Sequence, residues 1–313
     1  MLRQVWAAAL VLITAFGSLT LTIAMSGCNN QASSAKPDAK RPETGTGGKT
    51  QGVPRETVTT RETTVGGKTQ AQPQEIAVDL GQGVKLEMVL IAAGEFTMGS
   101  PDSDGNASGD EKPQHRIRIT KPFYLGKYLA TQEQWEAVMG TNPSNVKGPK
   151  NPVENVSWED CQQFCHMLNA KPHAGGKFQL PTEVQWEYAC RAGSTTYYCF
   201  GDEESGLGEY AWYGGNSHVQ THPVGKKKPN AWDLYDMHGN VWEWCQDWYD
   251  RGYYATSPTD DPTGPTMGSG RVFRGGGWDY PASSCRSAHR SDGEPGCRNY
   301  LLGLRVSLGP ADK

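Results

Sequence analysis

The chain has 313 residues, which is enough for one or two domains with a sizeable core. Its 30 Lys and Arg against 34 Asp and Glu give a formal net charge of −4, which argues against a nucleic-acid-binding protein because such proteins usually carry a basic surplus. The 10 Trp, 13 Tyr and 38 Gly favour a loop-rich fold held together by aromatic side chains over a helical bundle.

Residues 1–27 are predicted to be a lipoprotein signal peptide. Arg3 precedes an uncharged apolar run from Val5 to Met25, and two small residues then lead to Cys28. The sequence Met-Ser-Gly-Cys at this point resembles a bacterial lipobox, in which Cys28 carries the lipid. The alternative is a transmembrane anchor, since a run of this length could just span a bilayer. Either interpretation makes a bacterial membrane a partner and places the rest of the chain in the cell envelope, on the periplasmic or the cell-surface face.

Residues 28–75 are expected to form a disordered tether. Between Asn29 and Glu75 there is no aromatic residue and no Leu, Ile or Met, so this segment cannot bury enough apolar area to offset its ordering entropy. Apolar patterning begins at Ile76, and residues 76–310 are expected to form one folded domain.

The domain is expected to contain about three helices. A hydroxyl side chain at each predicted start is followed three residues later by a polar acceptor, which is the capping-box pattern. The three pairs are Thr131 with Gln134, Ser157 with Asp160, and Thr182 with Gln185. Gly140 and Gly193 stand where the first and third helices should end. Short alternating stretches at 115–120 and 271–274 predict strands, so the fold class is α+β.

The second predicted helix carries two cysteines on one apolar face. Cys161, Phe164, Cys165 and Leu168 have the i, i+3, i+4, i+7 spacing of a buried helix face. The neighbouring His166 raises the alternative of a zinc site, but it points away from the face that the cysteines share. Core packing is therefore the favoured interpretation.

Six ordered phrases together resemble one family. They are Gly-Glu-Phe-Thr-Met-Gly-Ser at 94–100, Leu-Pro-Thr-Glu-Val-Gln-Trp-Glu-Tyr-Ala-Cys-Arg-Ala-Gly at 180–193, His-Gly-Asn-Val-Trp-Glu-Trp-Cys at 238–245, Arg-Gly-Gly-Gly-Trp at 274–278, Cys-Arg-Ser-Ala at 285–288 and Gly-Leu-Arg at 303–305. This pattern is similar to the formylglycine-generating enzyme, or sulfatase-modifying-factor, family. The resemblance implies a C-type-lectin-like, loop-rich α+β domain with short strands.

The resemblance does not carry the family's oxidase chemistry to this chain. Members that convert a sulfatase cysteine to formylglycine bind copper with a Cys-x4-Cys pair that follows the Arg-Gly-Gly turn. Here Cys285 is the only cysteine in the corresponding segment, 277–285, and a thiolate pair cannot be made from one residue. We therefore expect no catalytic residue and no copper.

The resemblance implies one disulfide hypothesis. Relatives cross-link the position of Cys190 to a position that reads Ser287 in this chain. Cys285 lies two residues earlier, on the same face if this segment is a strand, so a Cys190–Cys285 disulfide is predicted.

The resemblance also implies a calcium loop, with Asp236, Gly239, Val241 and Glu243 as its ligands. Side-chain and carbonyl oxygens at this spacing suit calcium, which is thus the expected cofactor. The alternative is a tight Gly-Asn turn with Glu243 in a salt bridge. A second acidic stretch, 102–106, lacks the glycine that an EF-hand loop needs and is expected to be a solvated loop.

A binding module is the predicted function. The segment from 279 to 302 resembles the variable segment of retroelement-diversified lectin-fold proteins, and its Tyr and Asn side chains suit recognition. The candidate ligand-binding residues are Trp278, Asp279, Tyr280, His289, Arg290, Asn299 and Tyr300, with Asp292 and Arg298 beside them. A protein or a glycan is the expected ligand. Two alternatives remain: an oxidoreductase that modifies a sulfatase cysteine, and a structural lipoprotein of an envelope complex.

Overall fold

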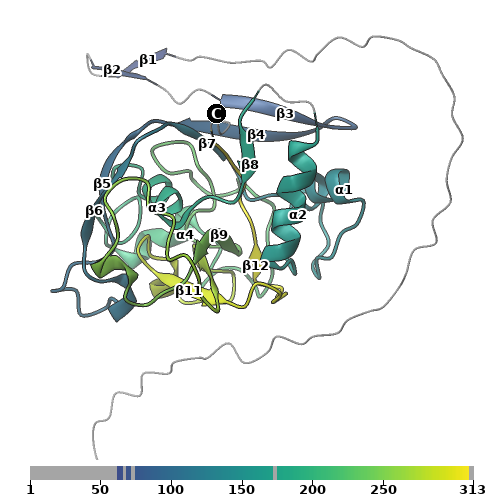
Figure 1. Cartoon of the computed structure of the whole chain (residues 1–313). Coiled ribbons are helices and arrows are strands. Elements are labelled where there is room, and N and C mark those ends of the chain that lie inside the picture. The colour runs from purple at the N-terminus through teal and green to yellow at the C-terminus, as the bar shows by residue number, and fades with distance from the viewer. Residues whose placement is uncertain (1–61, 66–67, 72–74, 172–174, 310–313) are drawn as a thin grey trace, which may run out of the picture.

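Figure 1 shows the computed structural model of the chain, which describes residues 62–65, 68–71, 75–171 and 175–309. The predicted signal peptide, Cys28 and most of the predicted tether lie outside these ranges. In the described ranges, no helix is both long enough and apolar enough to cross a membrane.

Two short strands lie inside the segment that was predicted to be a tether without structure. They are β1 (Glu62–Val65) and β2 (Lys68–Ala71), which pair antiparallel with each other. Residues 62–65 and 68–71 are thus paired strand, and the rest of the predicted tether up to residue 74 lies outside the described residues, where the tether stays a prediction. The Thr and Val residues of Glu-Thr-Thr-Val favour a strand.

The three predicted helices begin where their capping boxes place them. Thr131, Ser157 and Thr182 each accept a hydrogen bond from a backbone N–H three residues on, and the side chain at that position bonds back. The resulting helices are α1 (Gln132–Met139), α2 (Trp158–Asn169) and α3 (Glu183–Arg191). A fourth, single-turn helix, α4 (Leu207–Tyr210), was not predicted.

The predicted C-terminal capping residue is confirmed for α1 and differs by one position for α3. Gly140 caps α1 in the left-handed conformation with φ 73°, as predicted. At α3 the capping residue is Ala192, with φ 45°, and Gly193 follows it with φ 91°.

A five-stranded sheet forms one side of the domain and contains both of its ends. Its spatial order is β3-β4-β7-β13-β8, and the strands are β3 (Glu75–Gly81), β4 (Val84–Ile91), β7 (Phe123–Gly126), β13 (Ser307–Gly309) and β8 (Lys177–Gln179). Because β13 pairs with both β7 and β8, the last strand is enclosed by earlier ones. This sheet thus joins the strand that begins at Glu75 to the strand that contains Gly309.

Helices α1 and α2 lie side by side near one end of this sheet (Figure 1). The rings of Trp135 and Phe164 stack between them, with centroids 5.0 Å apart. Gln134 Nε2 donates to the Lys85 carbonyl of β4, which fixes α1 on the sheet. Cys161, Phe164, Cys165 and Leu168 are all buried, so the predicted apolar face of α2 packs into the core.

Two smaller sheets complete the domain. One is the hairpin of β5 (Gly94–Met98) and β6 (His115–Ile119), which lies on the opposite side of the molecule from α1 and α2 (Figure 1). The other has the order β11-β10-β9-β12 and consists of β11 (Arg290–Gly293), β10 (Arg271–Arg274), β9 (Trp242–Trp248) and β12 (Leu302–Gly303). The predicted strands at 115–120 and 271–274 correspond to β6 and β10. Long loops with short 3-10 turns join these elements, so the domain is a loop-rich mixture of helix and sheet.

Candidate functional site

A glycine turn after β10 positions the segment in which binding residues were predicted. Gly275 and Gly276 have φ values of 103° and 77°, which side chains rarely adopt. A Cβ at Gly276 would lie 2.6 Å from Cys285 Sγ, so the turn also needs glycine for space. It brings Trp278 back toward the start of β9, and the backbone N–H of Trp278 donates to the carbonyl of Asn240, two residues before that strand.

Five of the aromatic rings near this turn form what we call the aromatic patch: Trp242, Trp278, Tyr280, His289 and Tyr300. The Trp242 ring lies 5.1 Å from that of Tyr280 and 5.8 Å from that of His289, and the Trp278 ring lies 5.8 Å from that of Tyr300. The indole Nε1 atoms of Trp242 and Trp278 are buried without a hydrogen-bond partner. Two predicted residues, Tyr280 and His289, thus lie against Trp242, which the prediction did not include, and two others, Trp278 and Tyr300, lie against each other.

The other predicted ligand-binding residues have different positions. Asp279 is exposed beside the patch, but Arg290 is only 4% exposed and bonds Glu183 through Nε at 2.6 Å and Nη2 at 2.8 Å. Asn299 Oδ1 accepts from the Leu301 N–H within its own turn. The prediction for Arg290 is therefore wrong, because a buried guanidinium that is paired with a buried carboxylate cannot meet a ligand. Exposed Arg298 pairs with Asp160 of α2.

The predicted Cys190–Cys285 disulfide is not formed. Both thiols are free, and Cys190 Sγ lies 3.7 Å from Ser287 Oγ. Cys285 is fully buried against the glycine turn, and burial raises the pKa of its thiol. The hypothesis fails because Ser287, not Cys285, faces Cys190, which matches the position that the family resemblance gave for its partner.

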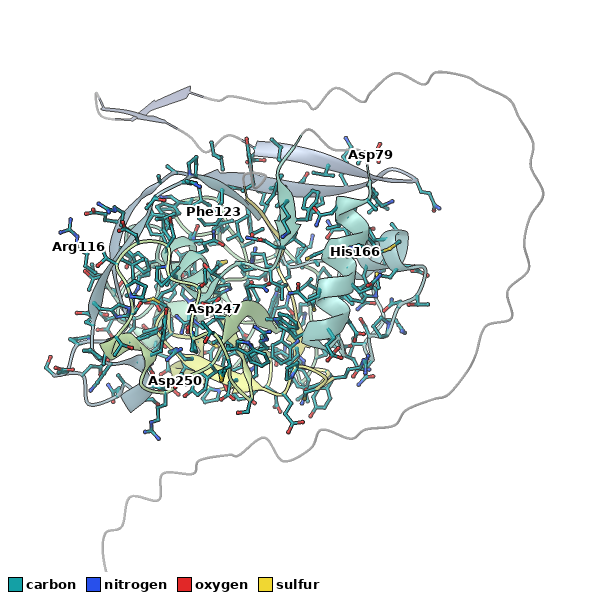
Figure 2. The ribbon with its side chains drawn as sticks, in the orientation of Figure 1. Asp79, Arg116, Phe123, His166, Asp247 and Asp250 are labelled. Carbon is teal, nitrogen blue, oxygen red and sulfur yellow. The ribbon has the colours of Figure 1, made fainter. Side chains whose placement is uncertain are left out.

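No zinc site forms at Cys161 and Cys165. Burial raises the pKa of both thiols, whereas His166, which Figure 2 labels on α2, is exposed. In the described part of the chain, no three His, Cys, Asp or Glu side chains gather into a metal-binding group. These cysteines belong to the core, as predicted.

In the predicted calcium loop, an unpartnered oxygen of Asp236 fits a bound cation, whereas the ion pair of Glu243 with Arg305 matches the alternative prediction of a salt bridge. Asp236 is buried; its Oδ2 accepts from the Gly225 N–H at 2.8 Å, while its Oδ1 has no partner. Glu243 accepts from Arg305 Nε at 2.9 Å, from Arg305 Nη2 at 3.0 Å and from Trp186 Nε1 at 2.9 Å. A carboxylate has about four lone-pair positions, so three donors leave one for a cation. The orphaned Asp236 oxygen is the observation that fits calcium, and Gly239 and Val241 stay predicted carbonyl ligands.

Burial also affects the protonation of Asp236. It raises the pKa of this carboxyl to about 6, against the opposing effect of the Gly225 N–H. A bound divalent cation would favour the ionised form and reverse that shift.

A network of buried arginine–carboxylate pairs was missed by the sequence analysis. Arg274 Nη2 bonds Glu187, Arg305 bonds Glu243, and Arg286 bonds Glu111 through two contacts of 2.7 Å. Each of these arginines is at most 4% exposed. All three arginines lie in the family-like phrases at 274–278, 285–288 and 303–305. The charged residues within those phrases were therefore the sequence signal from which the buried ion pairs could have been predicted.

A family model, a curated relative and two solved structures all relate this chain to the sulfatase-modifying-factor family or its fold. Residues 77–308 match the family model described as a sulfatase-modifying factor enzyme 1-like domain. The formylglycine-generating enzyme of Streptomyces coelicolor is 31% identical over 285 residues, which cover 70% of this chain and 88% of that enzyme. Among solved structures, Treponema denticola variable protein 1 has a TM-score of 0.68 at 32% identity and covers 75% of this chain and 99% of its own. PvdO from Pseudomonas aeruginosa has a TM-score of 0.67 at 29% identity and covers 74% and 97%.

Proposed function

This chain belongs to the sulfatase-modifying factor enzyme 1-like family, and from that premise we propose that it is a lipid-anchored, extracytoplasmic binding module and not a formylglycine-generating oxidase. The observation that carries the proposal is the state of Cys285. It is the one cysteine between 271 and 290, it is fully buried, and burial raises the pKa of its thiol. The copper site that the family resemblance implies needs a pair of thiolates, and this position has only one cysteine to supply them.

The aromatic patch supports a binding role. Tyr280 and Tyr300 offer rigid contact area with few torsions to fix, and Tyr300 is 43% exposed. The indole N–H groups of Trp242 and Trp278 are buried inside the patch, so the contact surface that it offers comes from Tyr280 and Tyr300. Similarity to a protein that is named a variable protein agrees with this interpretation.

The cell-envelope location is part of the same proposal. Cys28 follows an apolar run and two small residues, so lipid attachment there would hold the domain on a long tether. Metabolic labelling with a radioactive fatty acid tests this: label is expected in the wild-type chain and absent from Cys28→Ser. Label in the Cys28→Ser variant would contradict the anchor.

The oxidase alternative is tested directly with the purified full-length chain. It is loaded with copper and given oxygen, a reductant and a peptide with the sulfatase motif Cys-x-Pro-x-Arg, and the peptide is then read by mass spectrometry. The Streptomyces coelicolor formylglycine-generating enzyme serves as the positive control. We expect no conversion of the peptide cysteine to an aldehyde. Conversion by the folded chain would overturn the proposal and establish oxidase activity without the usual cysteine pair.

The binding role is tested on a glycan array and on surface proteins of candidate hosts. Tyr300→Ala is expected to weaken a retained interaction at least tenfold, because this side chain is the most exposed ring of the patch. Met267→Ala is the matched control, since Met267 is 78% exposed and lies outside the patch. Equal losses for both variants would place the binding surface elsewhere.

A further inference from the structure

A pocket lies outside the residues of the aromatic patch. It has a volume of about 410 Å³ and lies between the loop that follows β5, the loop that follows α3 and the turn after Cys285. Figure 1 shows β5, β6 and α3 on the side of the domain away from α1 and α2. The volume is in the range that takes a small ligand or a single side chain. The residues that decide its chemistry are Asp104, Arg191, Tyr197, Asp202 and Arg286.

One carboxylate in this pocket is buried and incompletely bonded. Asp104 is only 8% exposed, although the acidic stretch 102–106 was expected to be fully solvated. Its Oδ1 accepts from Tyr197 Oη at 2.9 Å and from the Asn106 N–H at 2.8 Å. Its Oδ2 is buried and has no partner. A buried carboxylate oxygen without a donor is costly unless a ligand supplies one.

The cations that line the pocket are already committed to other carboxylates. Arg286 bonds Glu111 through both Nη atoms, and Arg191 Nε bonds Glu187 at 2.9 Å. Asp104 forms no ion pair in the described residues, and neither does Asp202, whose Oδ1 accepts the Tyr197 N–H at 2.9 Å. The unpaired charge in the lining of the pocket is therefore negative.

From this arrangement we propose that the pocket binds an organic cation, namely the guanidinium or ammonium group of a basic side chain. The Arg286 guanidinium already lies 5.7 Å from the centroid of the Tyr197 ring, so the two unpaired carboxylates are the groups that a further cation would contact. Calcium fits less well, because it takes six or more oxygen ligands and both Oδ1 atoms already accept backbone or phenol hydrogens. The proposal uses only the geometry of this pocket and does not depend on the proposed function of the aromatic patch.

The probe is N-acetyl-arginine amide, titrated into the full-length chain by calorimetry. N-acetyl-citrulline amide has nearly the same shape without the charge, and calcium chloride tests a metal ion as the source of positive charge. We expect saturable binding of the arginine probe and at least tenfold weaker binding of the citrulline probe. Equal binding of the two probes, no binding of either, or binding of calcium in place of the arginine probe would each overturn the proposal.

Matched variants locate the site. Asp104→Asn keeps the Oδ1 acceptor and removes the charge, and it is expected to weaken arginine-probe binding at least tenfold. Asp202→Asn serves as a second variant in case Asp104→Asn does not fold, since Asp202 is exposed. Asp102→Asn is the control, because Asp102 is exposed on the same loop and outside the pocket lining. Unchanged binding in folded Asp104→Asn and Asp202→Asn would contradict the assignment.

Discussion

Cys190 Sγ and Ser287 Oγ face each other in the core at 3.7 Å. Both residues are fully buried, and 97 positions separate them in the chain. This relationship joins the end of α3 to the segment that follows the glycine turn. The two side chains are thus in contact although only one of them is a cysteine.

Ser287→Cys is expected to form a disulfide with Cys190 under oxidising conditions. Closing so long a loop should stabilise the fold by about 2–4 kcal/mol, mainly by restricting the unfolded chain. The measurement is thiol mapping by mass spectrometry together with thermal unfolding, with and without reductant. Ser287→Ala is the control that removes the hydroxyl without adding a thiol. A disulfide of the new Cys at position 287 with Cys285 in place of Cys190 would contradict the observed contact between Cys190 and position 287.

Arg290→Ala is expected to destabilise the protein by about 3–5 kcal/mol, because it removes the two-point partner of the buried Glu183 carboxylate and leaves Arg274 Nε, 3.6 Å away, as the nearest cation. Arg298→Ala is the matched control: Arg298 also forms a two-point pair, with Asp160, but its side chain is 54% exposed. Exposed pairs contribute about 0–1 kcal/mol. Chemical denaturation of both variants measures the difference, and similar losses would show that burial does not set the strength of these pairs.

Asp247 makes stability depend on pH. Burial, with the neighbouring Glu183 carboxylate, raises the pKa of this carboxyl to about 8, whereas an exposed aspartate has a pKa of about 4. Between these values the folded state holds a proton that the unfolded state has lost, so this contribution to stability is largest below pH 4 and declines as the pH rises toward 8.

Asp247→Asn should remove that decline, because the amide oxygen can still accept the Glu183 N–H that Asp247 Oδ2 accepts at 2.8 Å. The stability of the variant relative to wild type should therefore increase between pH 5 and pH 8, by up to about 1.4 kcal/mol per pH unit. Asp250→Asn is the control, since Asp250 is exposed near the edge of the domain and Asp247 lies inside it (Figure 2). A flat difference for Asp247→Asn across this range would show that its carboxyl is ionised when folded.

Calcium is expected to raise the unfolding temperature, and chelation with EGTA is expected to lower it. A ligand at 100 times its dissociation constant stabilises by about 2.7 kcal/mol. Asp236→Asn should abolish most of this response, because it removes the charge of the carboxylate whose Oδ1 is unpartnered. Asp79→Asn, at an exposed position of β3, should respond as wild type does. The same unfolding temperature in millimolar calcium and in EGTA would contradict calcium binding at this loop.

The sequence predicted those parts of the fold that depend on near neighbours. Each capping box joins a side chain to a backbone group three residues away, so Thr131, Ser157 and Thr182 begin helices wherever the domain places them. The apolar spacing of α2 similarly identified its buried face. The six ordered phrases indicated the family, which the match over residues 77–308 confirms.

Contacts between distant segments could not be predicted in this way. Arg290 looked like a binding residue because nothing in its neighbourhood shows that Glu183, 107 positions earlier, takes its charge. Asp104 looked solvated because the tyrosine that covers it is 93 positions away. Cys285 and Ser287 are two residues apart, and only the path of the chain around Gly276 decides which of them meets Cys190.

The sequence by itself thus determined the family, the helix starts and the absence of a Cys-x4-Cys pair. The tertiary structure alone decided which charged residues are internal supports and which line a pocket. The physical reason is that a helix start is stabilised by local hydrogen bonds, whereas the cost of burying a charge depends on partners that only the folded chain brings within reach.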